Sequence, residues 1–119
     1  MKGQFELKRT DNGRFMFNLK AGNGEIILTS GLYDSRAAAS EGVATVIACA
    51  HDDSQIERKV ASNRKPYFVL NTTTGDFLAK SEMYSSAAAM EKGIKSVLQN
   101  VGGATLKDLT ELEPELAKR

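Results

Sequence analysis

The chain has few of the residues that most often carry chemistry. Its 119 residues include one cysteine, one histidine, two prolines and no tryptophan. The lone cysteine, Cys49, cannot form an internal disulfide, which predicts a reducing compartment. Sixteen basic and 15 acidic residues leave a formal net charge of +1, so no large net field attracts the whole chain to nucleic acid or to an anionic membrane.

Long apolar runs are also absent. Near the N-terminus, Glu6 and Lys8 interrupt any candidate for the apolar stretch of a secretory signal. No window approaches the roughly 18 uncharged apolar residues of a membrane span. The sequence therefore predicts a cytoplasmic protein that makes no contact with a membrane.

No catalytic or cofactor motif is recognisable. Cys49 and His51 are two positions apart, and such residues on one helix do not face each other. We expect Cys49 to pack as an apolar residue and His51 to lie at a helix end. Gly22-Asn23-Gly24 leads into a β-branched stretch, so it predicts a hairpin turn and not a phosphate loop. We predict no enzyme activity, no catalytic residue, no metal site and no cofactor.

The most informative feature is an internal duplication. Residues 4–50 align with residues 55–101 without a gap, and 14 of the 47 aligned positions are identical. Two copies are too few for a solenoid. They predict a pseudo-symmetric pair in which each copy covers apolar surface that the other exposes.

Each copy predicts three strands followed by a helix. In the first copy, apolar alternation and β-branched residues favour strands near residues 5–8, 15–20 and 25–29, separated by glycine-containing turns. Apolar residues then recur at helical spacing. Asp34-Ser35 and Ser85-Ser86 stand where the two helices need N-caps. A further strand is expected after each helix, and residues 55–61 are expected to close the first copy and also to open the second.

The sequence resembles the YegP-like family of small, mostly bacterial proteins of unassigned biochemical function. The resemblance is carried by residues 17–30, by Tyr33-Asp34-Ser35, by the alanine-rich helix containing Gly42 and by Leu106-Lys107-Asp108-Leu109. It implies β-β-β-α-β repeats that share one antiparallel sheet by exchanging the strands that follow each helix. It implies no catalytic residues.

We therefore predict a single pseudo-symmetric α+β domain over residues 1–119, with both helices on one face of the sheet. Repeat one covers about residues 3–53 and repeat two about residues 54–110. A charged C-terminal tail, residues 111–119, follows. Because the second copy can replace a second subunit, the chain is expected to be a monomer or a weak dimer.

Positive charge gathers in two equivalent segments. Residues 1–20 and residues 55–65 each have a net charge of +3. We expect these segments to adjoin in the sheet and to form a basic face. Such a face is typical of sheets that bind single-stranded nucleic acid, although a solvated polar face is the simpler interpretation. The candidate residues are Met16, Lys20, Arg58, Lys59, Arg64, Lys65 and Tyr67.

Two helix glycines and two tyrosines have two interpretations each. Gly42 and Gly93 favour close packing of the helices, but a ligand groove beside either helix is the functional alternative. Tyr33 and Tyr84 precede the helices, where a tyrosine packs on the first turn or stacks on a ligand.

The absence of chemical motifs favours a non-enzymatic binding or adaptor module for a macromolecular partner of unknown identity. The alternative is a small-molecule or single-stranded nucleic-acid-binding protein that uses the basic strands.

Overall fold

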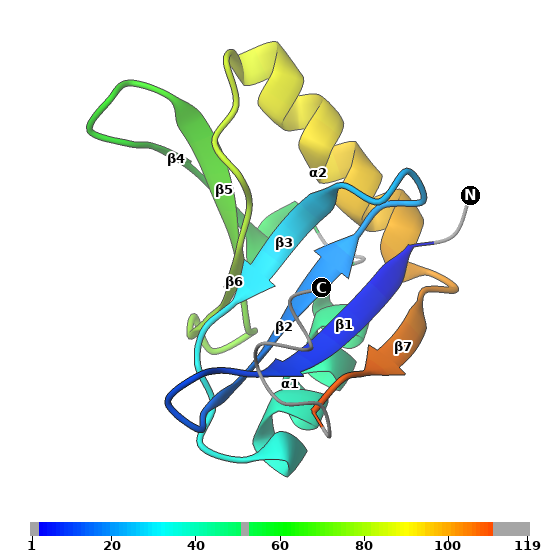
Figure 1. The fold of residues 1–119 in the computed structure, drawn as a ribbon. Helices are drawn as coiled ribbons and strands as arrows, with labels where there is room; N and C mark the ends of the chain where they lie inside the picture. The colour runs from blue at the N-terminus through cyan, green and yellow to red at the C-terminus, as the bar shows by residue number, and fades with distance from the viewer. Residues whose placement is uncertain (1–2, 51–52, 111–119) are drawn as a thin grey trace.

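The computed structural model describes residues 3–50 and 53–110 (Figure 1). Seven strands and two helices account for most of them, as the sequence predicts. In chain order they are β1 (Gln4–Arg9), β2 (Phe15–Lys20), β3 (Ile26–Ser30), α1 (Arg36–Cys49), a short 3-10 turn η1 (Asp53–Gln55), β4 (Ile56–Val60), β5 (Pro66–Asn71), β6 (Phe77–Lys80), α2 (Ala87–Val101) and β7 (Thr105–Asp108). The expected positions of His51 and of the tail, residues 111–119, lie outside the described residues.

The strands form one sheet in the order β4-β5-β6-β3-β2-β1-β7. All neighbours are antiparallel except β1 and β7, which are parallel. The predicted α+β fold of two tandem repeats is confirmed, with the correction that the sheet is mixed and not wholly antiparallel. Parallel neighbours need a long connection, and here β2 to α2 all lie between β1 and β7 in the chain.

Both strands that follow a helix pair with the other repeat. β4 follows α1 and pairs with β5, and β7 follows α2 and pairs with β1. The chain leaving α1 runs through η1 directly into β4, so β4 is also the first strand of the second repeat. No separate segment therefore remains in the first repeat to serve as a counterpart of β7.

The two repeats meet between β3 and β6, at the centre of the sheet. The ladder there contains two residue pairs, Thr29 with Lys80 and Ser30 with Ala79. Thr29 and Lys80 are equivalent positions of the duplication, so a pseudo-twofold axis passes between them. Around this axis, β3-β2-β1 corresponds to β6-β5-β4.

Both helices lie on the same face of the twisted sheet, as predicted (Figure 1). α1 contacts β1 and β2 but also β5 and β6, while α2 contacts β5 and β3. Each helix thus covers apolar surface of both repeats. The largest side chains enclosed in the core are Phe5, Phe17, Phe68, Leu7, Leu19, Leu28, Leu70, Val46, Val97 and Val101. Cys49 is buried in the same core, as predicted.

Local sequence signals fix the helix starts and the turns. Ser35 is the N-cap of α1, where its Oγ accepts a hydrogen bond of 3.0 Å from the backbone N of Ala38, and Ser86 caps α2 in the same way. Gly13 and Gly24 occupy the first two hairpin turns at φ values of +80° and +87°. Glycine adopts this left-handed conformation without the strain that a Cβ would introduce.

The two helix glycines are contact points for tyrosine rings. A Cβ on Gly42 would collide with the phenol oxygen of Tyr33, and a Cβ on Gly93 with that of Tyr84. Each tyrosine ring stacks on a buried phenylalanine, with centroids 6.1 and 6.2 Å apart. Burial raises the pKa of both tyrosines above the ordinary value. A tyrosine therefore fills the space beside each glycine, which supports the packing interpretation and leaves no groove there.

We expect Gly42→Leu to lower the free energy of unfolding by about 1–3 kcal/mol, because the new side chain must displace the Tyr33 ring from the core. Urea unfolding measures this change. Ala48→Leu is the matched control, since Ala48 is exposed on the same helix and should change stability by less than about 0.5 kcal/mol. Equal stability of the Gly42 variant and the wild type would show that the position is not tightly packed.

We also expect residues 1–53 expressed alone to be unable to form a stable monomer, because α1 would then leave part of its apolar face without a cover. Size-exclusion chromatography with light scattering and circular dichroism should show an unfolded or self-associated fragment. A folded monomer as stable as the full chain would contradict the shared core.

Candidate binding surface

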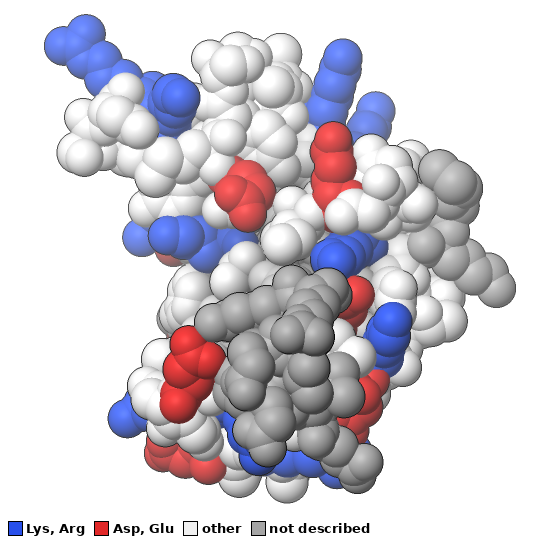
Figure 2. Space-filling model, viewed as in Figure 1, with Lys and Arg blue, Asp and Glu red and all other residues white. Residues whose placement is uncertain are grey.

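The structure separates the two basic segments that we expected to adjoin. The sheet has two wings, one formed by β3, β2, β1 and β7 and the other by β6, β5 and β4. β1 and β2 belong to the first wing, β4 and β5 to the second, and β3 and β6 lie between these pairs. The prediction of one continuous basic face is therefore wrong, because the pseudo-twofold axis at the centre of the sheet places β1 and β2 on one side and their counterparts β4 and β5 on the other. Figure 2 shows basic and acidic side chains interspersed over the described part of the visible surface.

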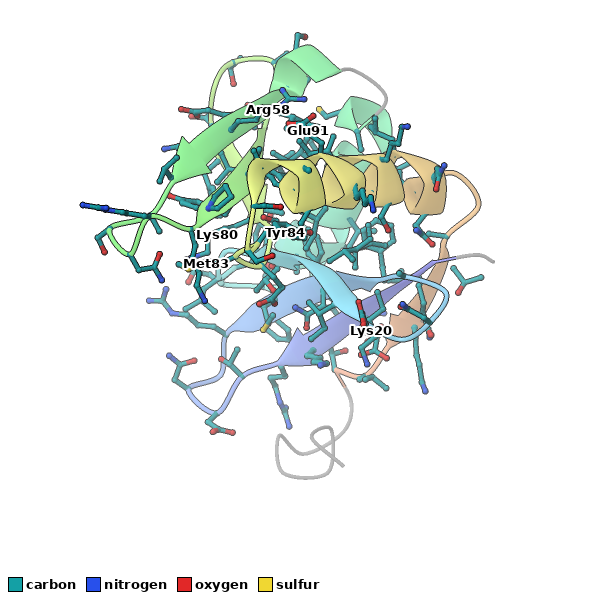
Figure 3. All side chains as sticks on the ribbon, turned by 90° about the horizontal axis from the view of Figure 1, so that it is seen from above. Lys20, Arg58, Lys80, Met83, Tyr84 and Glu91 are labelled. Atoms are coloured by element: carbon teal, nitrogen blue, oxygen red, sulfur yellow. The ribbon has the colours of Figure 1, made fainter. Side chains whose placement is uncertain are left out.

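Arg58 lies on the helix side of the sheet, not on the helix-free side with Lys59. Its Nε is 2.7 Å from Oε2 of Glu91 in α2, and its Nη2 is 3.0 Å from Oε1 of the same carboxylate (Figure 3). Successive side chains of a strand point to opposite faces, which explains why a run of basic residues in β4 divides between two surfaces.

The helix-free side of the β4-β5-β6 wing carries a small aromatic and basic cluster. Lys59 is directly opposite Tyr67 in the ladder. The Nζ of Lys80 lies 5.9 Å from the centroid of the Tyr67 ring, within the range of a cation–π interaction. Glu57 partly neutralises the cluster, because its carboxylate is 3.7 Å from the Nζ of Lys59.

The remaining candidate residues do not join this cluster. Arg64, at a positive φ of 68°, and Lys65 lie in the exposed hairpin between β4 and β5. Lys20 is on the other wing, 3.1 Å from the carboxylate of Glu6. Met16 is half-buried on that wing. The structure thus brings together two of the seven predicted residues, Lys59 and Tyr67.

A groove lies on the helix side of β4, between this strand and α2. Its volume is about 260 Å³. Apolar side chains from α2 and charged side chains from α2 and β4 border it. The lining residues are Arg58, Glu91, Lys92, Ile94, Lys95 and Leu98.

Lys92 and Lys95 give this groove positive charge. Both are exposed on α2, and neither has an ion-pair partner among residues 3–50 and 53–110. The equivalent positions of α1 are Glu41 and Ala44. Identities between the two copies do not reveal these lysines, because they are found only where the sequences of the two helices differ.

β4, which contributes Arg58 to the groove, is an edge strand of the sheet. β4 pairs with β5 on one side, and no strand of the described chain lies on its other side. Phe68, opposite Arg58, directs its N–H and C=O to Ser81 instead of to β4. Backbone groups alternate in direction along a strand, so Ile56, Arg58 and Val60 direct theirs away from β5.

The equivalent edge of the first repeat is covered. β7 lies beside β1, where the backbone N of Leu109 donates to the O of Leu7 at 2.8 Å and that of Thr105 to the O of Gly3 at 3.2 Å (Figure 1). Leu7 is the counterpart of Arg58 in the duplication. The edge beside Leu7 is therefore covered by a strand, whereas no strand of the described residues covers the equivalent edge beside Arg58.

β7 is held to α1 by an ion pair. The Nε of Arg36 is 2.7 Å from Oδ2 of Asp108. The backbone N and Oγ1 of Thr110 donate to Oδ1 of the same carboxylate at 2.9 and 2.6 Å. These hydrogen bonds from Thr110, with a smaller contribution from Arg36, lower the pKa of Asp108 to about 2.

Metal and membrane sites find no support in the described residues. Within residues 3–50 and 53–110, no group of three or more histidine, cysteine, aspartate and glutamate side chains is arranged to hold a metal ion. Neither of the described helices is long and apolar enough to cross a bilayer.

Comparison with known proteins identifies the family. The family model "Domain of unknown function (DUF1508)" matches residues 11–57 and again residues 61–108. The chain belongs to this family. A UPF0339 protein of Pasteurella multocida is 47% identical over 108 residues, covering 91% of this chain and 95% of that protein. The UPF0339 protein YegP of Yersinia pestis is 44% identical over 108 residues, covering 91% and 96%.

Two solved structures share the fold. The solution structure of YegP from E. coli has a TM-score of 0.89 at 42% identity and covers 95% of this chain and 97% of that one. The solution structure of a UPF0339 protein from Shewanella oneidensis has a TM-score of 0.87 at 44% identity, covering 92% and 93%. The predicted resemblance to YegP is confirmed. The family description and these relatives' names state no catalytic activity.

We expect Asp108→Asn to weaken the attachment of β7. Because the folded pKa of Asp108 lies below its unfolded value of 3.8, the ionised carboxylate stabilises the fold above about pH 4, and this contribution is lost as the pH falls toward 2. The variant should therefore have a lower urea midpoint than the wild type at pH 7, with a smaller difference at pH 3. Asp34→Asn, at an exposed aspartate, is the control. A pH-independent difference would contradict the assignment.

Proposed function

We propose that the protein is a non-enzymatic module that binds an extended segment of a partner protein as an added strand on β4. One observation carries this proposal. The edge of β1 is covered by β7, whereas the equivalent edge of β4 has no strand in the described chain. An edge strand with outward-directed backbone groups is a template for another strand.

The groove beside β4 supports this mode of binding. When a peptide adds to a sheet, main-chain hydrogen bonds supply affinity, and pockets for alternate side chains supply specificity. A strand added to β4 would direct every second side chain toward α2. There the groove offers apolar surface of Ile94 and Leu98 together with the charged side chains of Lys92 and Lys95.

The composition of β4 limits its association with other copies of the chain. Glu57, Arg58 and Lys59 are all exposed, and charged side chains on an edge strand oppose uncontrolled pairing. We therefore propose that the module is a monomer until it meets its partner. A cytoplasmic location belongs to the same proposal and rests on the single buried cysteine.

A single-stranded nucleic acid is the second candidate partner. The observation in its favour is the cluster of Lys59, Tyr67 and Lys80, because a base can stack on an aromatic ring flanked by cations. The cluster has one aromatic ring and lies on the opposite side of the sheet from the groove. The two candidates can therefore be distinguished by the residues that a ligand perturbs.

A peptide-library selection followed by nuclear magnetic resonance tests the proposal. Peptides selected on the immobilised protein from a random library should shift the backbone amide signals of β4 and of the α2 residues beside the groove. An oligothymidylate at low salt serves as the second ligand. Peptide-induced shifts confined to other surfaces, or a failure to select any peptide, would overturn the proposal. Shifts at Tyr67 and Lys80 caused by the oligonucleotide alone would instead favour the nucleic-acid candidate.

A proline substitution gives a sharper version of this test. Val60→Pro removes a backbone N–H that points away from β5, so the β4-β5 ladder keeps its hydrogen bonds. It should weaken peptide binding by roughly tenfold or more, because an added strand loses a main-chain hydrogen bond and meets the proline ring. Leu106→Pro on β7, at the opposite edge of the sheet, is the matched control and should leave binding unchanged.

A further inference from the structure

We infer that the strand bound at β4 runs parallel to it and places an apolar and an acidic side chain, two residues apart, over the groove. This inference rests on the proposed function and specifies the chemistry of its ligand. Within residues 3–50 and 53–110, β7 on β1 is the one example in which a strand occupies this position.

β7 shows which side chains such a strand presents to the helices. Leu106 is paired with Phe5 and Asp108 with Leu7. Phe5 and Leu7 are both buried in the core between the sheet and the helices. Leu106 and Asp108 are therefore on the helix side of β7, and the Arg36–Asp108 ion pair confirms this direction. The pattern is an apolar residue followed two positions later by a carboxylate.

The duplication transfers this pattern to the open edge. The counterparts of Phe5 and Leu7 are Ile56 and Arg58. An apolar side chain of the added strand would thus lie beside Ile56, on the helix side of the sheet. The acidic side chain would lie beside Arg58, next to α2.

The source of positive charge differs between the two repeats. Arg36, which holds Asp108, has Ala87 as its counterpart, so α2 offers no cation at that position. Instead, α2 carries Lys92 and Lys95 along the groove. Both are exposed and without an ion-pair partner in the described chain. A carboxylate in the groove is therefore met by cations that the first helix does not have.

The orientation follows from the pseudo-twofold axis. β7 is parallel to β1, and the axis relates β1 to β4. The symmetry-equivalent strand is parallel to β4, with its N-terminal end near Ile56 and its C-terminal end near Val60. A peptide that runs in this direction places its apolar residue beside Ile56 and its acidic residue, two positions later, beside Arg58. This is the order of Leu106 and Asp108 in β7.

The β7 segment itself is the probe. A synthetic peptide covering residues 103–110 is titrated into the labelled full chain, alongside a peptide in which Asp108 is replaced by Lys. We expect the first peptide to shift the β4 and α2 groove amides, and its affinity to fall as salt rises. The second should bind at least about fivefold more weakly, because it places an ammonium group, in place of a carboxylate, in a groove lined by Lys92 and Lys95. Equal binding of both peptides would overturn the acidic part of the inference.

A charge exchange provides the matched control. Lys92→Glu/Lys95→Glu in the full chain should weaken the first peptide and strengthen the Lys-substituted one, a reversal that loss of folding cannot produce. Arg64→Glu/Lys65→Glu changes the net charge equally in the exposed hairpin and should leave the preference unaltered. If the hairpin variant reversed the preference to the same extent, the preference would be due to the net charge of the protein and not to the groove.

Direction and mode of binding are read from modified peptides. Methylating the backbone nitrogens of Thr105 and Lys107, on the side that faces β1 in the intact sheet, should abolish binding, while methylating those of Leu106 and Asp108 should not. A spin label at the peptide N-terminus should broaden signals near Ile56 and not near Val60. Broadening near Val60 would overturn the parallel orientation. Library peptides that bind β4 while the β7 peptides do not would refute this inference and leave the proposed function standing.

Discussion

The fold depends on a core that neither repeat encloses by itself. The direct ladder between the repeats consists of only two residue pairs, Thr29 with Lys80 and Ser30 with Ala79. Such a short junction contributes little compared with the apolar surface beneath it, because each buried aliphatic or aromatic side chain contributes about 1.5–3 kcal/mol. α1 and α2 both pack across this junction. The repeats are therefore joined mainly through their helices, and the sheet is continuous because the helices hold its halves together.

The asymmetry of the molecule follows from how the chain uses its segments. After α2, the chain has a separate strand, β7, that crosses to β1. After α1, the corresponding stretch is already the first strand of the second repeat. One segment cannot be both an opening strand and a covering strand. A duplicated sequence with strand exchange at both ends thus has one closed wing and one open wing, and the groove beside β4 is a consequence of this connectivity.

Most of the fold was predictable from the sequence, because its signals are local and repeated. The Ser35 and Ser86 caps, the glycine turns and the alternating apolar residues each specify a short stretch, and the duplication confirms each signal once more. The candidate site was harder to predict because it depends on strand order. The sequence does not show that β2 and β5 are separated by β3 and β6, or that Arg58 faces Glu91 while Lys59 faces Tyr67. Lys92 and Lys95 become meaningful only once β4 is known to be an edge.

The pairing of β1 with β7 also has a consequence for biosynthesis. The two strands are close to opposite ends of the described chain, yet they are direct neighbours in the sheet. During translation, β1 leaves the ribosome long before β7, and its edge is covered only after β7 has emerged. Contacts between such distant segments slow folding. Once β4, β5 and β6 have joined the sheet, and until β7 pairs with β1, the nascent chain exposes the edges of both β1 and β4, and a chaperone that binds extended segments would find both accessible.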